Sequence, residues 1–354
     1  MFKFSDKKDG TSLGVDVGTK VIRIVELSRK KGKISLENYG EVNLDVASKE
    51  FFRSFDKKTL NPAVENISTA IKAIIEESGI KPNKVVFSLP DFATFFTTFE
   101  LPPMSKKEIA NAVGFESRKY IPLPLSELVL DWQVMSENSE KENNKILVMA
   151  VQNSIVEQYK GIADGAGLTL TALEAETMAL KRAVYKKGDP ATCLLEIGFQ
   201  STNVSIADQD FLKTSFSFDL AGKDLTFALS ETLGITIKQA EALKKKEGLN
   251  GRISHILTPL LSIISEKVKK VIREFETKEG KKVERVIVAG GTSLLPGIID
   301  YFKKSLAQEE SQIIDVVLAN SLKDISYPPV LEKKIEEINT TYAIALGEAL
   351  RKFE

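Results

Sequence analysis

Short runs of apolar and β-branched residues, bounded by turn residues, alternate along this chain with longer stretches in which apolar residues recur every three or four positions. The short runs predict β-strands, and the longer stretches predict helices with one apolar face. The expected strands are Leu13–Val17, Val21–Leu27, Lys33–Glu41, Val85–Leu89, Thr94–Leu101, Leu128–Val134, Lys145–Val151, Thr192–Ile197, Asn203–Ala207, Phe211–Phe216 and Val286–Ala289. The last of these is apolar throughout, which is typical of a parallel strand covered on both faces.

Capping residues mark the ends of several expected helices. Asn61 is expected to cap a helix that has Pro62 in its first position and ends at Gly79. Capping boxes, in which a hydroxyl residue and a carboxylate or amide three positions later bond each other's backbone, are expected at Ser105–Glu108 and Thr236–Gln239. Further helices are expected at residues 155–165, from residue 223 onwards and at residues 252–278.

The same turn occurs twice, in the segments 13–20 and 195–202. In each, an apolar strand ends in an acidic residue, Asp16 or Glu196, followed by a spacer, a glycine and a small or hydroxyl residue. The glycine allows a tight turn whose N–H groups face an anion, and the acidic side chain can hold a metal ion. Two such turns 180 positions apart predict an α/β protein with duplicated domains that close on one polyphosphate.

Composition narrows the functional classes. The 354 residues include 49 basic and 49 acidic side chains, so no charge excess points to nucleic acid or to a membrane surface as a partner. The single cysteine, Cys193, lies in an apolar run and is expected to be a core thiol, and a single histidine, His255, argues against a histidine-based triad or metal cluster. No apolar run reaches the ~20 residues of a membrane-spanning helix, so we expect a cytoplasmic protein.

Three motifs resemble those of the actin-like ATPase superfamily. Asp16–Thr19 and Glu196–Thr202 are similar to its two phosphate motifs, and Val288–Thr292 is similar to its adenosine motif, in the same order across nearly the whole chain. Within that superfamily the chain resembles the PilM family of type IV pilus assembly platform proteins. That resemblance rests on the segments 13–19, 24–27, 116–124, 130–134 and 340–347, of which Tyr120–Pro124 is the most distinctive.

The resemblance implies an α/β protein with the actin-like ATPase fold: two duplicated lobes and an inserted subdomain of the type found in PilM and FtsA. We expect the first actin-like subdomain to comprise residues 1–83, 166–189 and 339–354, and the inserted subdomain to comprise residues 84–165. The second actin-like subdomain is expected at residues 190–220 and 284–338, with a helical insertion at residues 221–283.

The resemblance also implies ATP and Mg²⁺ as ligands and assigns roles to individual residues. Asp16 would hold Mg²⁺ through water, and Glu176 would orient the attacking water, unless Glu176 is a surface carboxylate that merely begins a helix. Glu241 and Lys244 would hold the ribose and base, although a solvated pair three residues apart explains them as well. The implied nucleotide-binding residues are Gly18, Thr19, Lys20, Gly198, Ser201, Thr202, Gly222, Glu241, Lys244, Gly290, Gly291 and Thr292.

Glu196 departs from the family pattern, which usually has aspartate at this catalytic position of the second phosphate motif. The extra methylene keeps the charge but moves the carboxylate by more than about 1 Å, and a positioning error of that size costs about 10²-fold in rate. We therefore expect ATP binding with slow or absent hydrolysis.

The leading hypothesis is a cytoplasmic ATP-binding scaffold recruited to the inner face of the cytoplasmic membrane. The resemblance implies that the N-terminal cytoplasmic tail of PilN, an inner-membrane pilus protein, binds in a groove between the first subdomain and the insertion. Other inner-membrane platform proteins and self-association are further expected contacts. An extended tail gains affinity from backbone hydrogen bonds and a few side-chain pockets. Phe92, Phe95, Phe96 and Phe99 are candidates for the wall of that groove, or for the core beneath a strand.

Two other classes of protein are compatible with the fold. A filament-forming ATPase of cell division, similar to FtsA, is the main alternative. FtsA ends in an amphipathic membrane helix, whereas this sequence closes with Leu350–Glu354, so we expect membrane contact only through partners. A small-molecule kinase needs a general base over the cleft, and no aspartate lies in a recognisable sugar-kinase setting. The motifs do not distinguish a machine for pili from one for DNA uptake or secretion.

Overall fold

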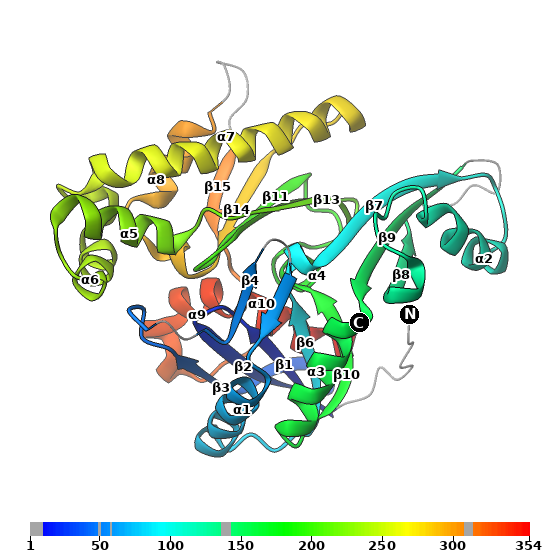
Figure 1. The fold of residues 1–354 in the computed structure, drawn as a ribbon, viewed down its shortest axis with the longest axis horizontal. Helices are drawn as coiled ribbons and strands as arrows, with labels where there is room; N and C mark the ends of the chain where they lie inside the picture. Colours follow the sequence, from blue (N-terminus) through cyan, green and yellow to red (C-terminus); the bar gives the residue numbers. More distant parts are fainter. Residues whose placement is uncertain (1–9, 49–50, 57–58, 136–142, 308–313) are drawn as a thin grey trace.

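Two five-stranded sheets of the same topology form the centre of the molecule (Figure 1). The computed structural model describes residues 10–48, 51–56, 59–135, 143–307 and 314–354. The first sheet has the order β10-β6-β1-β2-β3, and the second has the order β13-β12-β11-β14-β15. Their strands are β1 Gly10–Val17, β2 Val21–Lys30, β3 Lys33–Asn43, β6 Lys84–Leu89, β10 Thr169–Ala175, β11 Thr192–Ile197, β12 Thr202–Asp208, β13 Phe211–Phe218, β14 Arg285–Ala289 and β15 Asp315–Leu318.

The two sheets repeat one pattern of strand pairing. β1 pairs antiparallel with β2 and parallel with β6, and β11 likewise pairs antiparallel with β12 and parallel with β14. In both lobes the turn between the antiparallel strands carries the glycine motif. The duplicated α/β architecture expected from the two turns is therefore confirmed.

Helices α4 Glu176–Val184 and α10 Ala343–Leu350 lie where the two lobes meet. Their apolar side chains join residues of β11 and β14 in one buried cluster, and α10 also packs on β1. Gly347 makes the crossing of these helices possible, because a Cβ at this position would lie 1.9 Å from the carbonyl oxygen of Ala179 on α4. The lobes are thus joined by a close helix contact as well as by the loops of the cleft.

The remaining helices of the two lobes cover their sheets. On the first sheet, α1 Val64–Ser78 and α3 Asn153–Gly165 share one apolar core with the strands. Cys193 lies in the core of the second lobe, as expected from its apolar run. The helices that build this second core are α5 Gly222–Leu233, α6 Ile237–Glu247, α7 Ser254–Glu279 and α8 Ile298–Ser305, and α9 Ile335–Thr341 precedes α10.

A three-stranded sheet lies beside the two lobes (Figure 1). It consists of β7 Thr94–Leu101, β8 Leu128–Val134 and β9 Asn144–Gln152 in the order β7-β9-β8, and α2 Lys106–Ser117 packs on it. Two elements within the range 84–165 expected for the insertion contact the first lobe. β6 pairs with β1, and α3 packs beside α1, so both elements belong to the first lobe.

One expected helix start is wrong, while other helix ends are confirmed. A hairpin of two short strands precedes α1: β4 Arg53–Asp56 and β5 Thr59–Pro62. Because pairing with β4 draws Asn61 and Pro62 into a strand, α1 begins after Ala63, which makes no side-chain cap. Gly79 ends α1 in the left-handed conformation, as expected. Both expected capping boxes are present, in α2 and α6.

Candidate functional site

The first phosphate loop follows β1. Asp16, near the end of β1, is buried, and its Oδ1 accepts a hydrogen bond of 2.9 Å from the hydroxyl of Ser88 on β6. The Gly18 N–H donates to the carbonyl oxygen of Val21 at 2.8 Å and closes the turn. A tight turn beside a carboxylate at the end of a central strand is the arrangement that suits a phosphate and its counter-ion.

The second phosphate loop follows β11 and has the same form. The Gly198 N–H donates to the carbonyl oxygen of Ser201 at 3.0 Å. Glu196 is buried, and Asn203 Nδ2 donates to its Oε2 at 3.2 Å. Burial, together with the neighbouring Glu176 carboxylate, raises the pKa of Glu196 well above its usual range.

Glu176 connects the first lobe to the second loop. It begins α4, is buried, and accepts hydrogen bonds from Arg53 Nη2 at 2.5 Å and from Asn203 Nδ2 at 3.3 Å. Burial raises the pKa of Glu176; Arg53 opposes this shift, and the Asp16 carboxylate adds to it. The alternative of a surface carboxylate is therefore wrong, because Glu176 is enclosed between the lobes.

Sequence analysis missed two residues of this network, Arg53 and Asn203. Arg53 lies on the β4–β5 hairpin, 123 positions before Glu176 and outside any recognised motif. Asn203 directly follows the second phosphate motif, and an amide side chain next to that motif is a signal that could have identified it. Thr202, which the motif assigns to the phosphate loop, donates its hydroxyl to the Leu220 carbonyl oxygen at 2.6 Å.

The two phosphate loops also contact each other. Thr19 Oγ1 donates to Gln200 Oε1 at 3.4 Å across the lobes. Lys20 is buried, and its Nζ donates to the carbonyl oxygens of Ser48 at 2.7 Å and Asp45 at 3.3 Å. The Lys20 ammonium group, expected to face the phosphates, thus contacts the loop that follows β3.

Farther along the second lobe, the residues expected to hold the adenosine come together. Lys244 Nζ lies 2.7 Å from Glu241 Oε2 and donates to the carbonyl oxygen of Gly222 at 3.0 Å. Thr226 Oγ1 donates to Glu241 Oε2 at 2.6 Å. Because Lys244 is only 6% exposed, the alternative of a solvated surface pair is wrong.

The glycine turn after β14 reaches the second phosphate loop. Gly290 has a φ of 87°, and a Cβ there would lie 2.5 Å from Glu196 Oε1, so the close approach requires glycine. Thr292 Oγ1 donates to the carbonyl oxygen of Gly198 at 3.2 Å. A Cβ built on Gly291 meets nothing within 4 Å, which leaves open surface beside the turn.

The chemistry of these groups fits a nucleoside polyphosphate. Arg53 presents two buried donor atoms, Nε and Nη1, that have no hydrogen-bond partner among the described residues, and such donors suit an anion. The open surface at Gly291 suits a flat base close to the backbone. The fit to Mg²⁺ is weaker. Within the described part of the chain, no three acidic, histidine or cysteine side chains are grouped to hold a metal ion, so binding through water at Asp16 stays a prediction.

Asp91 is a further buried carboxyl group at the junction of the lobes. It lies in a short 3₁₀ turn before β7, where its Oδ1 accepts from the Thr177 N–H at 3.2 Å and its Oδ2 accepts from Ser215 Oγ at 3.4 Å. Burial, assisted by the Glu176 carboxylate, raises the pKa of Asp91 to about 8. No motif predicted this residue, because its environment is assembled from three separate segments.

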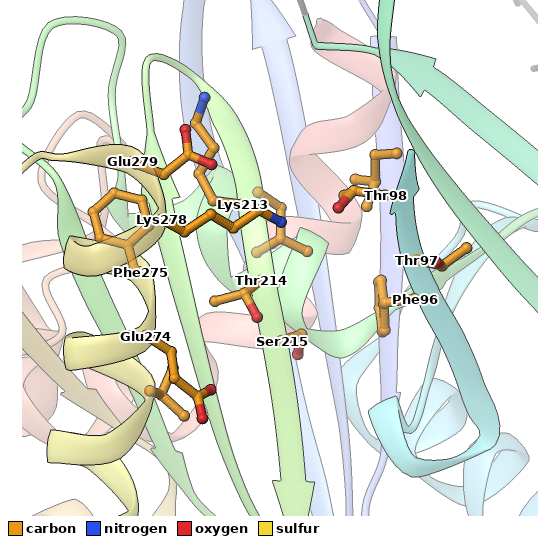
Figure 2. Close-up of a pocket in the computed structure, with 13 residues that line it drawn as sticks. Phe96, Thr97, Thr98, Lys213, Thr214, Ser215, Glu274, Phe275, Lys278 and Glu279 are labelled. Carbon is orange, nitrogen blue, oxygen red and sulfur yellow. The ribbon is translucent and has the colours of Figure 1, made fainter. Parts of the chain in front are cut away.

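A cavity of about 240 Å³ lies between the three-stranded sheet and the second lobe (Figure 2). One wall is β7, and the other is β13 with the C-terminal part of α7. β7 and β13 are each the edge strand of their sheet, so each has one side without a neighbouring strand in the described structure. Lys145 on β9 and Glu279 on α7 form an ion pair of 2.5 Å between the same two subdomains.

Among the four phenylalanines proposed as a groove wall, only Phe96 lines this cavity. Phe95 and Phe99 pack in the core of the three-stranded sheet, and Phe92 packs against the core of the first lobe. The core interpretation therefore holds for these three residues, while Phe96 lines a cavity that is not the expected groove beside the first lobe.

Two lobes of repeated topology that meet at a polar cleft define the actin-like ATPase fold. MreB 5 of Spiroplasma citri, solved with AMPPNP bound, superposes with a TM-score of 0.50 at 14% identity, covering 92% of this chain and 97% of that one. A solved PilM–PilN type IV pilus biogenesis complex superposes with a TM-score of 0.83 at 23% identity, covering 97% of this chain and 98% of that one. The family model of the type IV pilus assembly protein PilM matches residues 14–353, and the chain therefore belongs to the PilM family.

A curated relative from cell division is also similar to the chain. The cell division protein FtsA of Enterococcus faecalis is 22% identical over 353 residues, which cover 85% of this chain and 77% of that protein. Within the described residues, the structure has no helix that is both long and apolar enough to span a membrane.

Proposed function

We propose that this protein is an ATP-binding scaffold of a type IV pilus or related assembly platform, which binds the N-terminal cytoplasmic tail of PilN. The observation that carries the nucleotide part is the buried polar network from Arg53 through Glu176 and Asn203 to Glu196, which links the lobes where the phosphate loops meet. Membership of the PilM family supports the pilus part.

ATP would lie between the two phosphate loops, with its base toward the turn after β14. The loop backbone and Arg53 supply donors for the phosphates, while Lys244 and Glu241 order the helices beside the base. Bound Mg²⁺ would neutralise part of the phosphate charge. In this arrangement a nucleotide contacts both lobes and favours the closed form.

Slow or absent hydrolysis follows from the state of the two carboxyl groups. A residue that orients or activates water needs a free carboxylate within hydrogen-bond reach of that water. Glu176 is already held by Arg53 and Asn203, and burial favours the protonated form of Glu196. Neither group is prepared to act on water, which suits a scaffold whose nucleotide state serves assembly.

The cavity of Figure 2 is the site that we propose for the PilN tail. An extended peptide can pair with an exposed strand edge, and two such edges, β7 and β13, form opposite walls of this cavity. Phe96 offers an apolar contact, while Lys213 and Thr214 on β13 offer polar contacts. This location lies between the insertion and the second lobe, whereas the sequence predicted a groove between the insertion and the first lobe.

Through that tail the protein would act at the inner face of the cytoplasmic membrane. Contacts with other inner-membrane platform proteins, and self-association, are part of the same proposal. The similarity to FtsA keeps a filament-forming ATPase as the second candidate.

A calorimetric titration of the ATP-loaded protein with a synthetic peptide of the PilN tail from the same genome tests the proposal. We expect saturable one-to-one binding and a loss of about 10-fold in affinity for Phe96→Ala, from the lost aromatic contact. Phe115→Ala is the matched control, because Phe115 is 67% exposed on α2 and does not line the cavity.

Three results would change the assignment. If Phe96→Ala leaves peptide binding intact, we would assign the tail to the groove beside the first lobe instead. No peptide binding, with ATP demonstrably in the cleft, would favour the filament, which sedimentation with ATP would then reveal. Failure to retain any nucleotide would refute the cleft as an ATP site.

A further inference from the structure

Arg53 is attached to the first phosphate loop through its neighbour in the chain. The Phe52 N–H donates to the carbonyl oxygen of Thr19 at 3.0 Å, and the Phe52 carbonyl oxygen accepts from the Ala63 N–H at 2.7 Å. Through Phe52, the start of β4 is therefore hydrogen-bonded both to the first phosphate loop and to the residue before α1. Arg53 therefore lies close to the point where β1 ends and the first phosphate loop begins.

The guanidinium group of Arg53 is buried but only partly satisfied. The residue is 6% exposed, and its Nη2 pairs with Glu176 Oε1 at 2.5 Å. Among the described residues, no acceptor makes a well-formed hydrogen bond to its buried Nε or Nη1, and the hydroxyl of the buried Tyr159 lies beside the guanidinium group. Unmade hydrogen bonds of a buried cation are costly, so a native fold that retains them is expected to use them for a ligand.

The charges around this group indicate what the ligand is. Arg53 interacts electrostatically with Glu176 and Asp16, the two carboxylates expected to orient water and to hold the cation. Nε and Nη1 point in diverging directions and form no single fork, but each is a charged donor that suits an anionic phosphate oxygen better than a neutral carbonyl oxygen. In the proposed function, the anion nearest to this point is the phosphate end of a nucleotide held between the two phosphate loops.

We propose that Arg53 donates a charged hydrogen bond to the terminal phosphate of a nucleoside triphosphate from one of its unpaired nitrogens while Nη2 stays on Glu176. This proposal rests on the proposed nucleotide binding and adds a residue that the motifs do not contain. A triphosphate reaches Arg53 and a diphosphate does not. Binding of the terminal phosphate should therefore affect the β4–β5 hairpin and the start of α1, because the backbone of Phe52 connects Arg53 to both.

Calorimetric affinities for ATP and for ADP, each with Mg²⁺, provide the test. In Arg53→Gln we expect ATP affinity to fall about 10- to 100-fold, as for lost charged hydrogen bonds, and ADP affinity to stay within about threefold. Arg53→Lys keeps the charge but not the fixed donor directions of the guanidinium group, and we expect it to restore only part of the ATP preference. Arg285→Gln is the control, because Arg285 lies at the start of β14, at the far end of that strand from the glycine turn.

Arg53→Gln also leaves Glu176 buried without its cation and can lower stability for that reason alone. A second comparison removes this ambiguity: Glu176→Gln as the background and Arg53→Gln added to it, both checked for native thermal unfolding. We expect the ratio of ATP to ADP affinity to fall at least about 10-fold between these two proteins.

An unchanged ratio in the folded double variant would overturn the role of Arg53 and leave the proposed nucleotide binding standing, provided that ATP and ADP both bind. Absence of binding of either nucleotide to the wild-type protein would overturn both proposals. A parallel loss of ATP and ADP affinity in every Arg53 variant would show that Arg53 only holds the cleft together, which also contradicts a terminal-phosphate contact.

Discussion

Replacing Asp91 by asparagine should stabilise the protein, and more so as the pH rises. Asp91 is 4% exposed at the junction of the lobes, where burial and the Glu176 carboxylate raise the pKa of Asp91 from 3.8 to about 8. The native protein therefore keeps this proton at neutral pH, whereas the unfolded chain releases it above pH 4. An asparagine amide reproduces the protonated carboxyl, since its oxygen can accept from the Thr177 N–H and its NH₂ can donate to Ser215 Oγ.

The size of the effect follows from proton linkage. Between pH 4 and pH 8 the native state binds one more proton at Asp91 than the unfolded state does, so wild-type stability falls as the pH rises, by at most about 1.4 kcal/mol per pH unit. Above pH 8 both states are ionised and this dependence ends. The gain from Asp91→Asn should thus be near zero below pH 4, grow by about 1.4 kcal/mol per pH unit above it, and reach about 5 kcal/mol at pH 8.

Urea unfolding of both proteins at several pH values from 5 to 9 measures this difference directly. Asp164→Asn serves as the control, because Asp164 is exposed on α3 and its replacement should give a flat difference. A gain for Asp91→Asn that does not grow with pH, or a loss of stability at pH 8, would show that native Asp91 is ionised and would refute the reasoning.

Three further predictions concern buried positions in the two lobes. Gly347→Ala should lower the free energy of unfolding by about 3 kcal/mol or more, because its Cβ would meet the Ala179 carbonyl oxygen at 1.9 Å; an unchanged melting temperature would contradict the close crossing of α4 and α10. Cys193 should react with a thiol reagent only after unfolding, since burial raises the pKa of its thiol to about 12, and rapid labelling of the native protein would count against this. Lys244→Met should cost about 3 kcal/mol in urea unfolding because it breaks a buried ion pair, whereas Lys245→Met, whose side chain is 75% exposed, should cost under about 0.5 kcal/mol; equal effects would refute the difference in burial.

Hydrogen bonds within the chain bridge the cleft between the two lobes. Glu176 receives hydrogen bonds from Arg53 on the first lobe and Asn203 on the second, and Thr19 reaches Gln200 across the same gap. These contacts are made by the chain itself, so closure does not depend on the nucleotide alone. If the protein is the proposed scaffold, these contacts help to hold the surface that it presents to a partner.

Much of the architecture was predictable from the sequence. The two glycine turns indicated the duplicated lobes, and the capping boxes in α2 and α6 were found where their residues predicted them. The start of α1 was wrong, because Asn61 and Pro62 are good helix-start residues but also pair with β4 in a hairpin. For the site, the sequence predicted roles for Asp16, Glu176 and Glu196, which stay predictions, and it could not decide whether Glu176 was buried.

The sequence by itself determined what neighbouring residues control: turn geometry, helix caps, the apolar faces of strands and helices, and the motifs of the PilM family. These features depend on atoms a few positions apart, so the residue pattern is enough to predict them. Only the tertiary structure decided that Arg53 meets Glu176 across 123 positions, that Asp91 is enclosed by Thr177 and Ser215, and that a cavity separates β7 from β13. Such contacts depend on which strands pair and how the sheets pack, and burial then sets the charge state of each group, so no local pattern contains them.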